Sequence, residues 1–146
     1  MSRQVRILVA DRNRHVREFL QRELAAEGFC VETAADGREV LARMELQPLP
    51  ELLVLDLELP FVEGCEVAAR LKQMGVRIPI VVHSLPPRSP LPCSVEEIGP
   101  FVEKSGENIQ GLTCIIWKSL REAYPGRFPA PRGPQEPWDD APPGAP

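Results

Sequence analysis

Cysteine is scarce in this chain, and none of the cysteines forms a CxxC pair. The four of them stand at positions 30, 65, 93 and 114. This spacing indicates neither a zinc knuckle nor a thioredoxin-type redox motif. Scattered single cysteines are typical of free thiols in a reducing compartment, so we expect four unpaired thiols.

A long apolar segment is also missing near the N-terminus. The first apolar run there, VRILVA, is short and is followed at once by charged residues. Such a run is too short for a secretory signal or for a membrane-spanning helix. We therefore expect a cytoplasmic protein without membrane insertion.

The chain has no surplus of basic residues, and its formal net charge is -4. Proteins that bind nucleic acid or anionic membranes normally carry such a surplus, so we expect neither partner. What the chain does have is apolar material, because 43% of its 146 residues are hydrophobic. That is enough for one globular domain with its own core.

Short apolar runs alternate with segments of helical spacing, which predicts five strand and helix pairs. The expected strands are residues 5–10, 29–34, 51–56, 78–83 and 100–104. Such alternation is typical of an α/β fold with helices on both faces of a parallel sheet, a three-layer sandwich. The first, third and fourth strands are the most apolar and should be central. We therefore predict a flavodoxin-like (βα)5 fold with strand order 2-1-3-4-5.

Two proline-rich segments interrupt the pattern. Residues 84–99 hold four prolines, so the fourth helix should be degenerate: short and confined to Ser94–Ile98, displaced, or absent. Residues 125–146 hold eight prolines and three glycines and cannot bury much apolar surface. We predict one domain over residues 1–124 and a disordered or polyproline-like tail over residues 125–146.

Four polar side chains follow the predicted strands, at the edge where ligands bind in such sheets. Asp11 and Asp56 end the first and third strands, while Ser84 and Lys104 end the fourth and fifth. Two neighbouring carboxylates repel each other and attract a cation or retain a proton. With a hydroxyl and a lysine beside them, they predict a site for an oxyanion such as a phosphoryl group.

Together these stretches resemble the receiver domain of the bacterial response-regulator family, over residues 5 to about 124. The matching stretches, in chain order, are ILVAD with Asp11, LLVLDLELP with Asp56 and Pro60, Gly64, IPIVVHS with Ser84, and FVEKS with Lys104. Each motif alone is weak evidence. Their order along the chain, each at the end of the appropriate strand, makes the resemblance specific.

The resemblance implies that Asp56 is a phosphoacceptor, supplied by a histidine kinase or a phosphotransfer protein. It also implies a Mg²⁺ ion held by Asp11, Asp56 and the backbone carbonyl of Glu58. Arg12 departs from the family pattern, because a second acid normally stands there and a guanidinium cannot ligate a metal. Two alternatives follow: Mg²⁺ binding is weakened, or the guanidinium holds Asp56 in place of the ion. The side chain of Glu58 could pair with Arg12 or remain solvated.

The family assigns roles to three further positions. In the family, the residues at the positions of Ser84 and Lys104 contact the phosphoryl oxygens. The residue at the position of Phe101 is an aromatic switch near the fourth helix. Each of these residues also has a purely structural interpretation. Asp11 and Asp56 could be caps or strand ends, Ser84 a turn cap, Lys104 an edge charge, Phe101 a core residue and Arg12 a solvated charge.

Three functions follow from these observations. The first is a stand-alone receiver in a phosphorelay, not an enzyme, which signals to a downstream protein target. The second is a pseudo-receiver, an interaction module that works without phosphorylation. The third is a small α/β enzyme or flavin binder, which is disfavoured because the first turn, ADRNRHV, has no glycine-rich phosphate loop.

Overall fold

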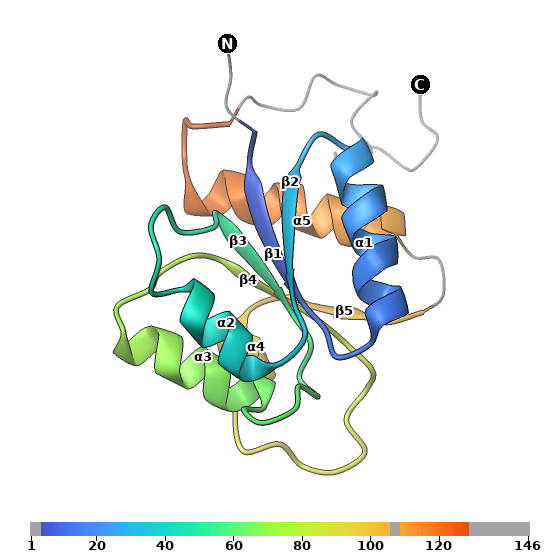
Figure 1. Cartoon of the computed structure of the whole chain (residues 1–146), viewed down its shortest axis with the longest axis vertical. Coiled ribbons are helices and arrows are strands. Elements are labelled where there is room, and N and C mark those ends of the chain that lie inside the picture. The colour runs from blue at the N-terminus through green and yellow to red at the C-terminus, as the bar shows by residue number, and fades with distance from the viewer. Residues whose placement is uncertain (1–3, 106–108, 129–146) are drawn as a thin grey trace.

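A computed structural model describes residues 4–105 and 109–128, and its centre is a five-stranded parallel sheet. The strands are β1 Arg6–Ala10, β2 Cys30–Ala34, β3 Leu52–Leu55, β4 Ile80–Ser84 and β5 Phe101–Glu103. Their order in the sheet is β2-β1-β3-β4-β5 (Figure 1). The predicted strand order and fold class are therefore confirmed.

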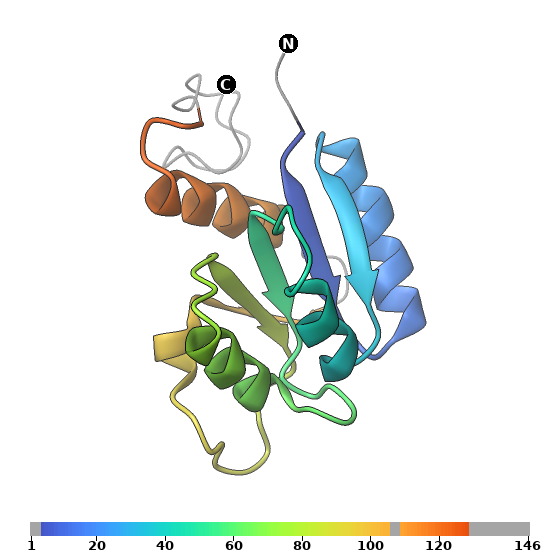
Figure 2. The ribbon, with the colours of Figure 1, turned by 60° about the vertical axis from the view of Figure 1, so that its left-hand side comes forward.

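Helices cover both faces of the sheet (Figure 2). They are α1 Arg14–Ala26, α2 Gly37–Arg43, α3 Gly64–Gln73, α4 Val95–Ile98 and α5 Ile109–Ala123. Because strand side chains alternate between faces, Ile7 and Val9 pack with α1 and α5, whereas Leu8 packs with α2 and α3. The central strand β3 is buried along its whole length, as its apolar sequence predicts.

The fourth helix is a single turn, which confirms the prediction from its prolines. It spans Val95–Ile98 and has Ser94 as its N-cap. Gly99 ends it with the backbone pressed against β4. A Cβ atom at Gly99 would lie 1.9 Å from the carbonyl oxygen of Ile80. Glycine is needed here for this close approach.

The expectation of four free thiols is wrong for two of them. Cys65 and Cys93 form a disulfide with their Cα atoms 5.8 Å apart, while Cys30 and Cys114 are thiols outside any disulfide. The two cysteines are separated by 28 positions in the sequence, which hides their proximity. The fold brings them together because helix α3 begins at the same edge of the sheet where β4 ends.

The packed part of the chain continues past α5. The ring of Phe128 packs edge-on against Tyr124, at 5.8 Å between centroids, and against Trp117, at 6.3 Å. Arg127 forms an ion pair with the buried Glu51 at the start of β3. Residue 124, the predicted domain boundary, thus lies inside this packed cluster. Most of the predicted tail, residues 129–146, falls outside the described residues and stays a prediction.

A membrane crossing would require a long apolar helix. Within residues 4–105 and 109–128, none of the helices combines the length and the apolar character that this requires.

Candidate functional site

Asp11 and Asp56 lie side by side where β1 and β3 end, at the edge to which the strand arrows point in Figure 2. The two strands pair through Ala10 and Leu55, so the next residues on each strand meet. The backbone N–H of Asp56 donates to the carbonyl of Ala10 at 3.0 Å. Both carboxylates are nearly inaccessible to solvent, with 1% and 2% of each residue exposed.

Lys104 contacts both carboxylates. Its Nζ lies 2.7 Å from Oδ2 of Asp11 and 3.0 Å from Oδ2 of Asp56. Pairing of β4 with β5 positions this lysine, because its backbone N–H donates to the carbonyl of Ser84 at 3.0 Å. The Ser84 hydroxyl in turn donates to Oδ1 of Asp56 at 3.1 Å. The structure thus gathers the four strand-end residues singled out in the sequence.

Backbone donors orient the two carboxylates further. The N–H of Glu58 donates to Oδ1 of Asp56 at 3.0 Å, and the N–H of Asn13 donates to Oδ1 of Asp11 at 2.8 Å. Asn13, and not Asp11, caps helix α1, since its side chain accepts from the N–H groups of His15 and Val16. The sequence interpretation missed Asn13, although Asn just before a helical pattern is a strong capping signal.

Burial and hydrogen bonding set the protonation of these groups. Burial raises the pKa of the Asp11 carboxyl, an effect that the hydrogen bonds from Lys104 and Asn13 partly offset. For Lys104, burial alone would lower the pKa, but its hydrogen bonds to Asp11 and Asp56 outweigh burial and raise it. Lys104 therefore remains a cation at neutral pH and partly neutralises the pair of carboxylates.

Arg12 pairs with Glu58 across the mouth of the site, with its Nη2 3.4 Å from Oε1 of Glu58. Both side chains are largely in solvent, 60% and 49% exposed respectively. Arg12 thus forms its recorded ion pair with Glu58, whereas Asp56 forms its recorded ion pair with Lys104. Of the alternatives drawn from the sequence, the one in which Glu58 pairs with Arg12 matches this geometry.

The donors present suit a Mg²⁺ ion that retains most of its water. Asp11 and Asp56 supply two neighbouring carboxylates, whereas the guanidinium of Arg12 cannot ligate a metal. Within the described part of the chain, no group of three or more His, Cys, Asp or Glu side chains gathers in a metal-binding arrangement. Mg²⁺ can be held by one or two carboxylates with water, so the residues present fit such an ion.

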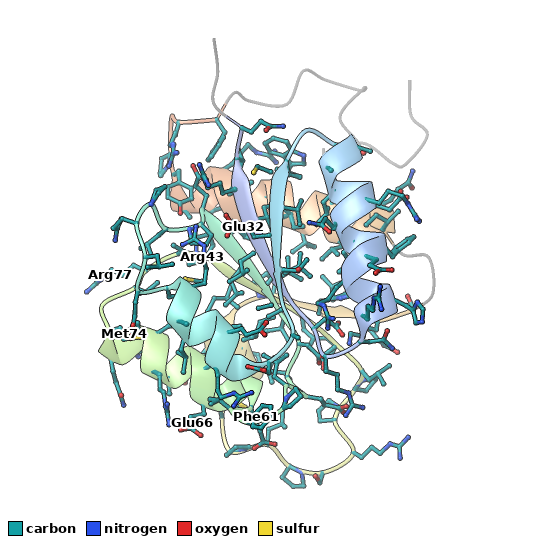
Figure 3. The ribbon with its side chains drawn as sticks, viewed as in Figure 1. Glu32, Arg43, Phe61, Glu66, Met74 and Arg77 are labelled. Carbon is teal, nitrogen blue, oxygen red and sulfur yellow. A yellow bond between two sulfur atoms is a disulfide. The ribbon has the colours of Figure 1, made fainter. Side chains whose placement is uncertain are left out.

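Two aromatic side chains are exposed to solvent, and the sequence singled out one of them. Phe101 opens β5 beside α4 and is 39% exposed, so it is not a core residue. Phe61, on the loop after β3, is 72% exposed and has a φ of 68°, which is rare for a bulky residue (Figure 3). The guanidinium of Arg38 lies 3.4 Å from the centroid of its ring. The sequence interpretation did not single out Phe61. Its position directly after Pro60, next to the Asp56 motif, was the feature that could have indicated it.

Comparisons with known proteins match the chain to one family. Residues 7–92 match the family model of the response regulator receiver domain. The response regulator MprA of Mycolicibacterium vanbaalenii is 45% identical over 78 residues, which are 53% of this chain and 33% of that protein. The chain thus spans about a third of the length of the curated relatives it matches.

Solved structures resemble the whole sheet and its helices. The response regulator TrrA of Thermotoga maritima, crystallised with Mg²⁺ and BeF, superposes with a TM-score of 0.71 at 29% identity. The alignment covers 80% of this chain and 99% of TrrA. A structure of the histidine kinase ThkA with TrrA gives a TM-score of 0.70 at 30% identity, with the same two coverages.

Proposed function

This chain belongs to the response regulator receiver domain family of two-component signalling, and on that premise we propose that it accepts a phosphoryl group on Asp56 and signals through protein contacts. The observation that carries the proposal is the set of contacts to one buried carboxylate. The Ser84 hydroxyl and the Lys104 ammonium both donate to Asp56. These are the two kinds of donor that an acyl phosphate at this position needs.

In the proposed reaction, a carboxylate oxygen of Asp56 attacks the phosphorus of a phosphohistidine. The P–O bond forms, the P–N bond breaks, and the imidazole nitrogen keeps the electron pair and takes a proton. Ser84 and Lys104 then donate to the phosphoryl oxygens instead of to the free carboxylate. Asp11 keeps the Lys104 ammonium at the site, since their atoms are 2.7 Å apart before the reaction.

We propose that Mg²⁺ binds this site weakly, held by Asp11, Asp56 and the carbonyl of Glu58. When bound, the ion would neutralise charge on the phosphoryl group. Arg12 can supply part of that charge, because exposed ion pairs such as Arg12 with Glu58 are worth only about 0–1 kcal/mol. The guanidinium can thus exchange Glu58 for a phosphoryl oxygen, with which it forms stronger hydrogen bonds.

The test adds Mg²⁺ with a small-molecule phosphodonor, or with beryllofluoride, and follows amide NMR shifts. We expect shifts at residues 56, 84 and 104 in the natural chain and none in Asp56→Asn. The substitution removes the nucleophile but keeps the size of the side chain. An absence of shifts in the natural chain at millimolar Mg²⁺ would contradict metal-dependent acceptance.

A pseudo-receiver is the second candidate function, and one observation favours it. Lys104 pairs with both Asp11 and Asp56 and so partly neutralises them, while Arg12 stands where the family has an acid. The Asp56→Asn variant separates the two functions. A pseudo-receiver would bind its protein target equally well with and without this substitution, whereas a phosphorylated receiver would lose the effect of the phosphodonor.

Partners follow from the same proposal. The complex of ThkA with TrrA supports a histidine kinase as the upstream partner, with a phosphotransfer protein as the alternative. We propose a protein as the downstream target, contacted through Phe101 and the neighbouring helix α4, and neither nucleic acid nor a membrane as a partner.

The stand-alone arrangement and the cytoplasmic location stay predictions. The disulfide removes part of the basis for that location.

A further inference from the structure

The disulfide joins two segments at the edge of the sheet that carries the site. Cys65 is the second residue of α3, and Cys93 stands just before Ser94, the N-cap of α4. Between Ser84, which ends β4, and this bond lie residues 85–93, which we call the clamped loop. The loop between β4 and α4 projects below α3 in Figure 2.

Little besides the disulfide holds the clamped loop. Within the described part of the chain, no hydrogen bond or ion pair joins residues 85–93 to another residue. Four of the loop's residues are prolines, which have no backbone donor. Helix α4, which follows, is a single turn with no buried residue. Because polar contacts are lacking, the covalent bond should dominate the loop's position.

The other end of the disulfide is anchored firmly beside Asp56. The N–H of Gly64, the first residue of α3, donates to the carbonyl of Leu57 at 3.0 Å. The helix approaches the chain so closely here that a Cβ at Gly64 would lie 2.8 Å from the carbonyl oxygen of Asp56. Cys65 therefore ties the clamped loop to the strand end that carries Asp56.

The clamped loop also forms one wall of a cavity that reaches Ser84. This cavity has a volume of about 220 Å³ and lies between the loops after β3 and β4. Glu58 and Glu63 line it from one side, and Leu85 and Arg88 line it from the clamped loop. A change in the position of the loop would thus change access to Ser84 and to its hydrogen-bond partner Asp56.

We propose that the Cys65–Cys93 disulfide is a redox-controlled clamp, which a dithiol reductant opens to release residues 85–93 and widen the cavity beside Ser84. The clamp itself is independent of the proposed function. Its effect on phosphorylation rests on that function.

The reductive step is an ordinary thiol–disulfide exchange. One thiolate of the dithiol attacks Sγ of Cys93, whose residue is partly exposed while Cys65 is buried. The S–S bond breaks, its electron pair leaves on Sγ of Cys65, and that thiolate then takes a proton. The second thiol of the reductant attacks the mixed disulfide and frees Cys93. Two electrons pass to the cysteines, and the dithiol leaves as its own disulfide.

The position of Cys65 suits it as the leaving group. It lies in the first turn of a ten-residue helix, where the unsatisfied N–H groups and the helix dipole favour negative charge. Exchange is faster when the leaving thiolate is stabilised.

Limited trypsin digestion tests the clamp, because Arg88 is exposed in the middle of the loop and is followed by Ser89. We expect cleavage of the Arg88–Ser89 peptide bond to be at least ten-fold faster in the dithiol-reduced protein than in the oxidised protein. Cys93→Ser should be cleaved at the fast rate with or without reductant. Cys114→Ser is the matched control, since it removes a cysteine that is not in the disulfide and should keep the response.

Thiol counting under denaturing conditions accompanies the digestion. The oxidised protein should show two reactive thiols and the reduced protein four. Four thiols without any reductant, or equal cleavage rates in protein with a verified disulfide, would overturn the clamp.

The rate of Asp56 phosphorylation by a small donor tests the link to the cavity. We expect the phosphorylation rate to differ at least three-fold between the oxidised and the reduced protein. In Cys93→Ser, the rate should be the same with and without reductant. Faster cleavage with an unchanged phosphorylation rate would overturn the widening of the cavity. No phosphorylation of either form would contradict the proposed function, while the cleavage rates would still decide the clamp.

Discussion

Lys104 is the residue on which the electrostatics of the site depend most. Asp11 and Asp56 are both buried, and two uncompensated carboxylates in such surroundings would be very costly. The ammonium of Lys104 contacts each of them within 3.0 Å, and its side chain is itself only 19% exposed. Arg12, by contrast, lies in solvent. Lys104 therefore neutralises the buried carboxylates, whereas Arg12 pairs with the exposed Glu58.

Replacing Arg12 by aspartate should strengthen Mg²⁺ binding at least ten-fold, about 1.4 kcal/mol. The natural site sets three carboxylates against two cations, whereas the variant sets four carboxylates against one. The added carboxylate also stands where the family places a metal ligand. Isothermal titration with MgCl₂ measures the change.

Arg14→Asp is the matched control for this prediction. Arg14 is also exposed and also paired with a glutamate, Glu18, but it lies outside the site. It should raise Mg²⁺ affinity far less, since a remote charge acts only through a screened field. Equal gains from the two substitutions would show that net charge, and not ligand position, limits metal binding.

His83 should make stability depend on pH. Burial lowers its pKa from 6.5 to about 4, with the charge of Lys104 acting in the same direction and that of Asp56 against it. Below pH 6.5 the unfolded chain therefore binds a proton that the folded chain refuses. Stability should fall as the pH drops from 6.5 toward 4, by about 2 kcal/mol between pH 7.5 and 5 from this residue.

Urea unfolding at pH 7.5 and pH 5 checks the His83 prediction. The loss on acidification should be about 2 kcal/mol smaller in His83→Asn than in the natural chain. His15→Asn is the control, and its loss should match that of the natural chain. An unchanged loss in His83→Asn would rule out His83 as the source.

At the scale of elements, α4 is the shortest of the described helices. A helix of one turn has few hydrogen bonds of its own and depends on its surroundings. Its surroundings here are Gly99, which presses against β4, and the disulfide before Ser94. Docking of α4, and with it the position of Phe101, therefore rests on a few contacts.

Gly99→Ala should lower the free energy of unfolding by about 2 kcal/mol, because its Cβ would overlap the backbone of Ile80. Gly75→Ala is the comparison, since nothing lies within 4 Å of a Cβ there and only its φ of 79° opposes the change. We expect about 1 kcal/mol for that variant. Urea unfolding measures both, and a Gly99→Ala protein as stable as the natural chain would show that α4 can shift without cost.

At the scale of the whole molecule, the two ends of the strands carry different tasks. The carboxyl ends hold the charged site, the clamped loop and the loop after β3 with the exposed Phe61. The opposite end holds the cluster in which Arg127 and Phe128 fasten the chain after α5 to Glu51 and Trp117. The hydroxyl of Tyr124 adds a hydrogen bond to the carbonyl of Glu51 at 2.7 Å.

Phe128→Ala should therefore lower the free energy of unfolding by about 2 kcal/mol, since it removes two edge-on ring contacts and partly buried apolar area. A chain ending at residue 128 is the control. Its stability should match the natural chain within about 0.5 kcal/mol, because the proline-rich segment has little apolar surface to bury. Chemical denaturation measures both. Equal stability of Phe128→Ala and the natural chain would place the end of the stabilising cluster before residue 128.

Local sequence was enough to predict the fold and which strand-end residues lie together. Strand and helix periods gave the order of elements, and the most apolar strands proved to be central. Asp11, Asp56, Ser84 and Lys104 were predictable as neighbours because parallel strands place all their carboxyl ends at one edge. The single turn of α4 followed from its prolines, which act within a few residues of themselves.

Tertiary structure alone decided which groups pair. Lys104 forms ion pairs with both aspartates, and Arg12 forms one with Glu58. Cys65 forms a disulfide with Cys93, at a sequence separation of 28. Phe128 joins the core from a segment whose composition predicted no packing. The physical reason is common to all four cases. Periodicity and turn chemistry act along the chain, whereas ion pairs, disulfides and ring contacts depend on distances between segments that only the folded chain brings together.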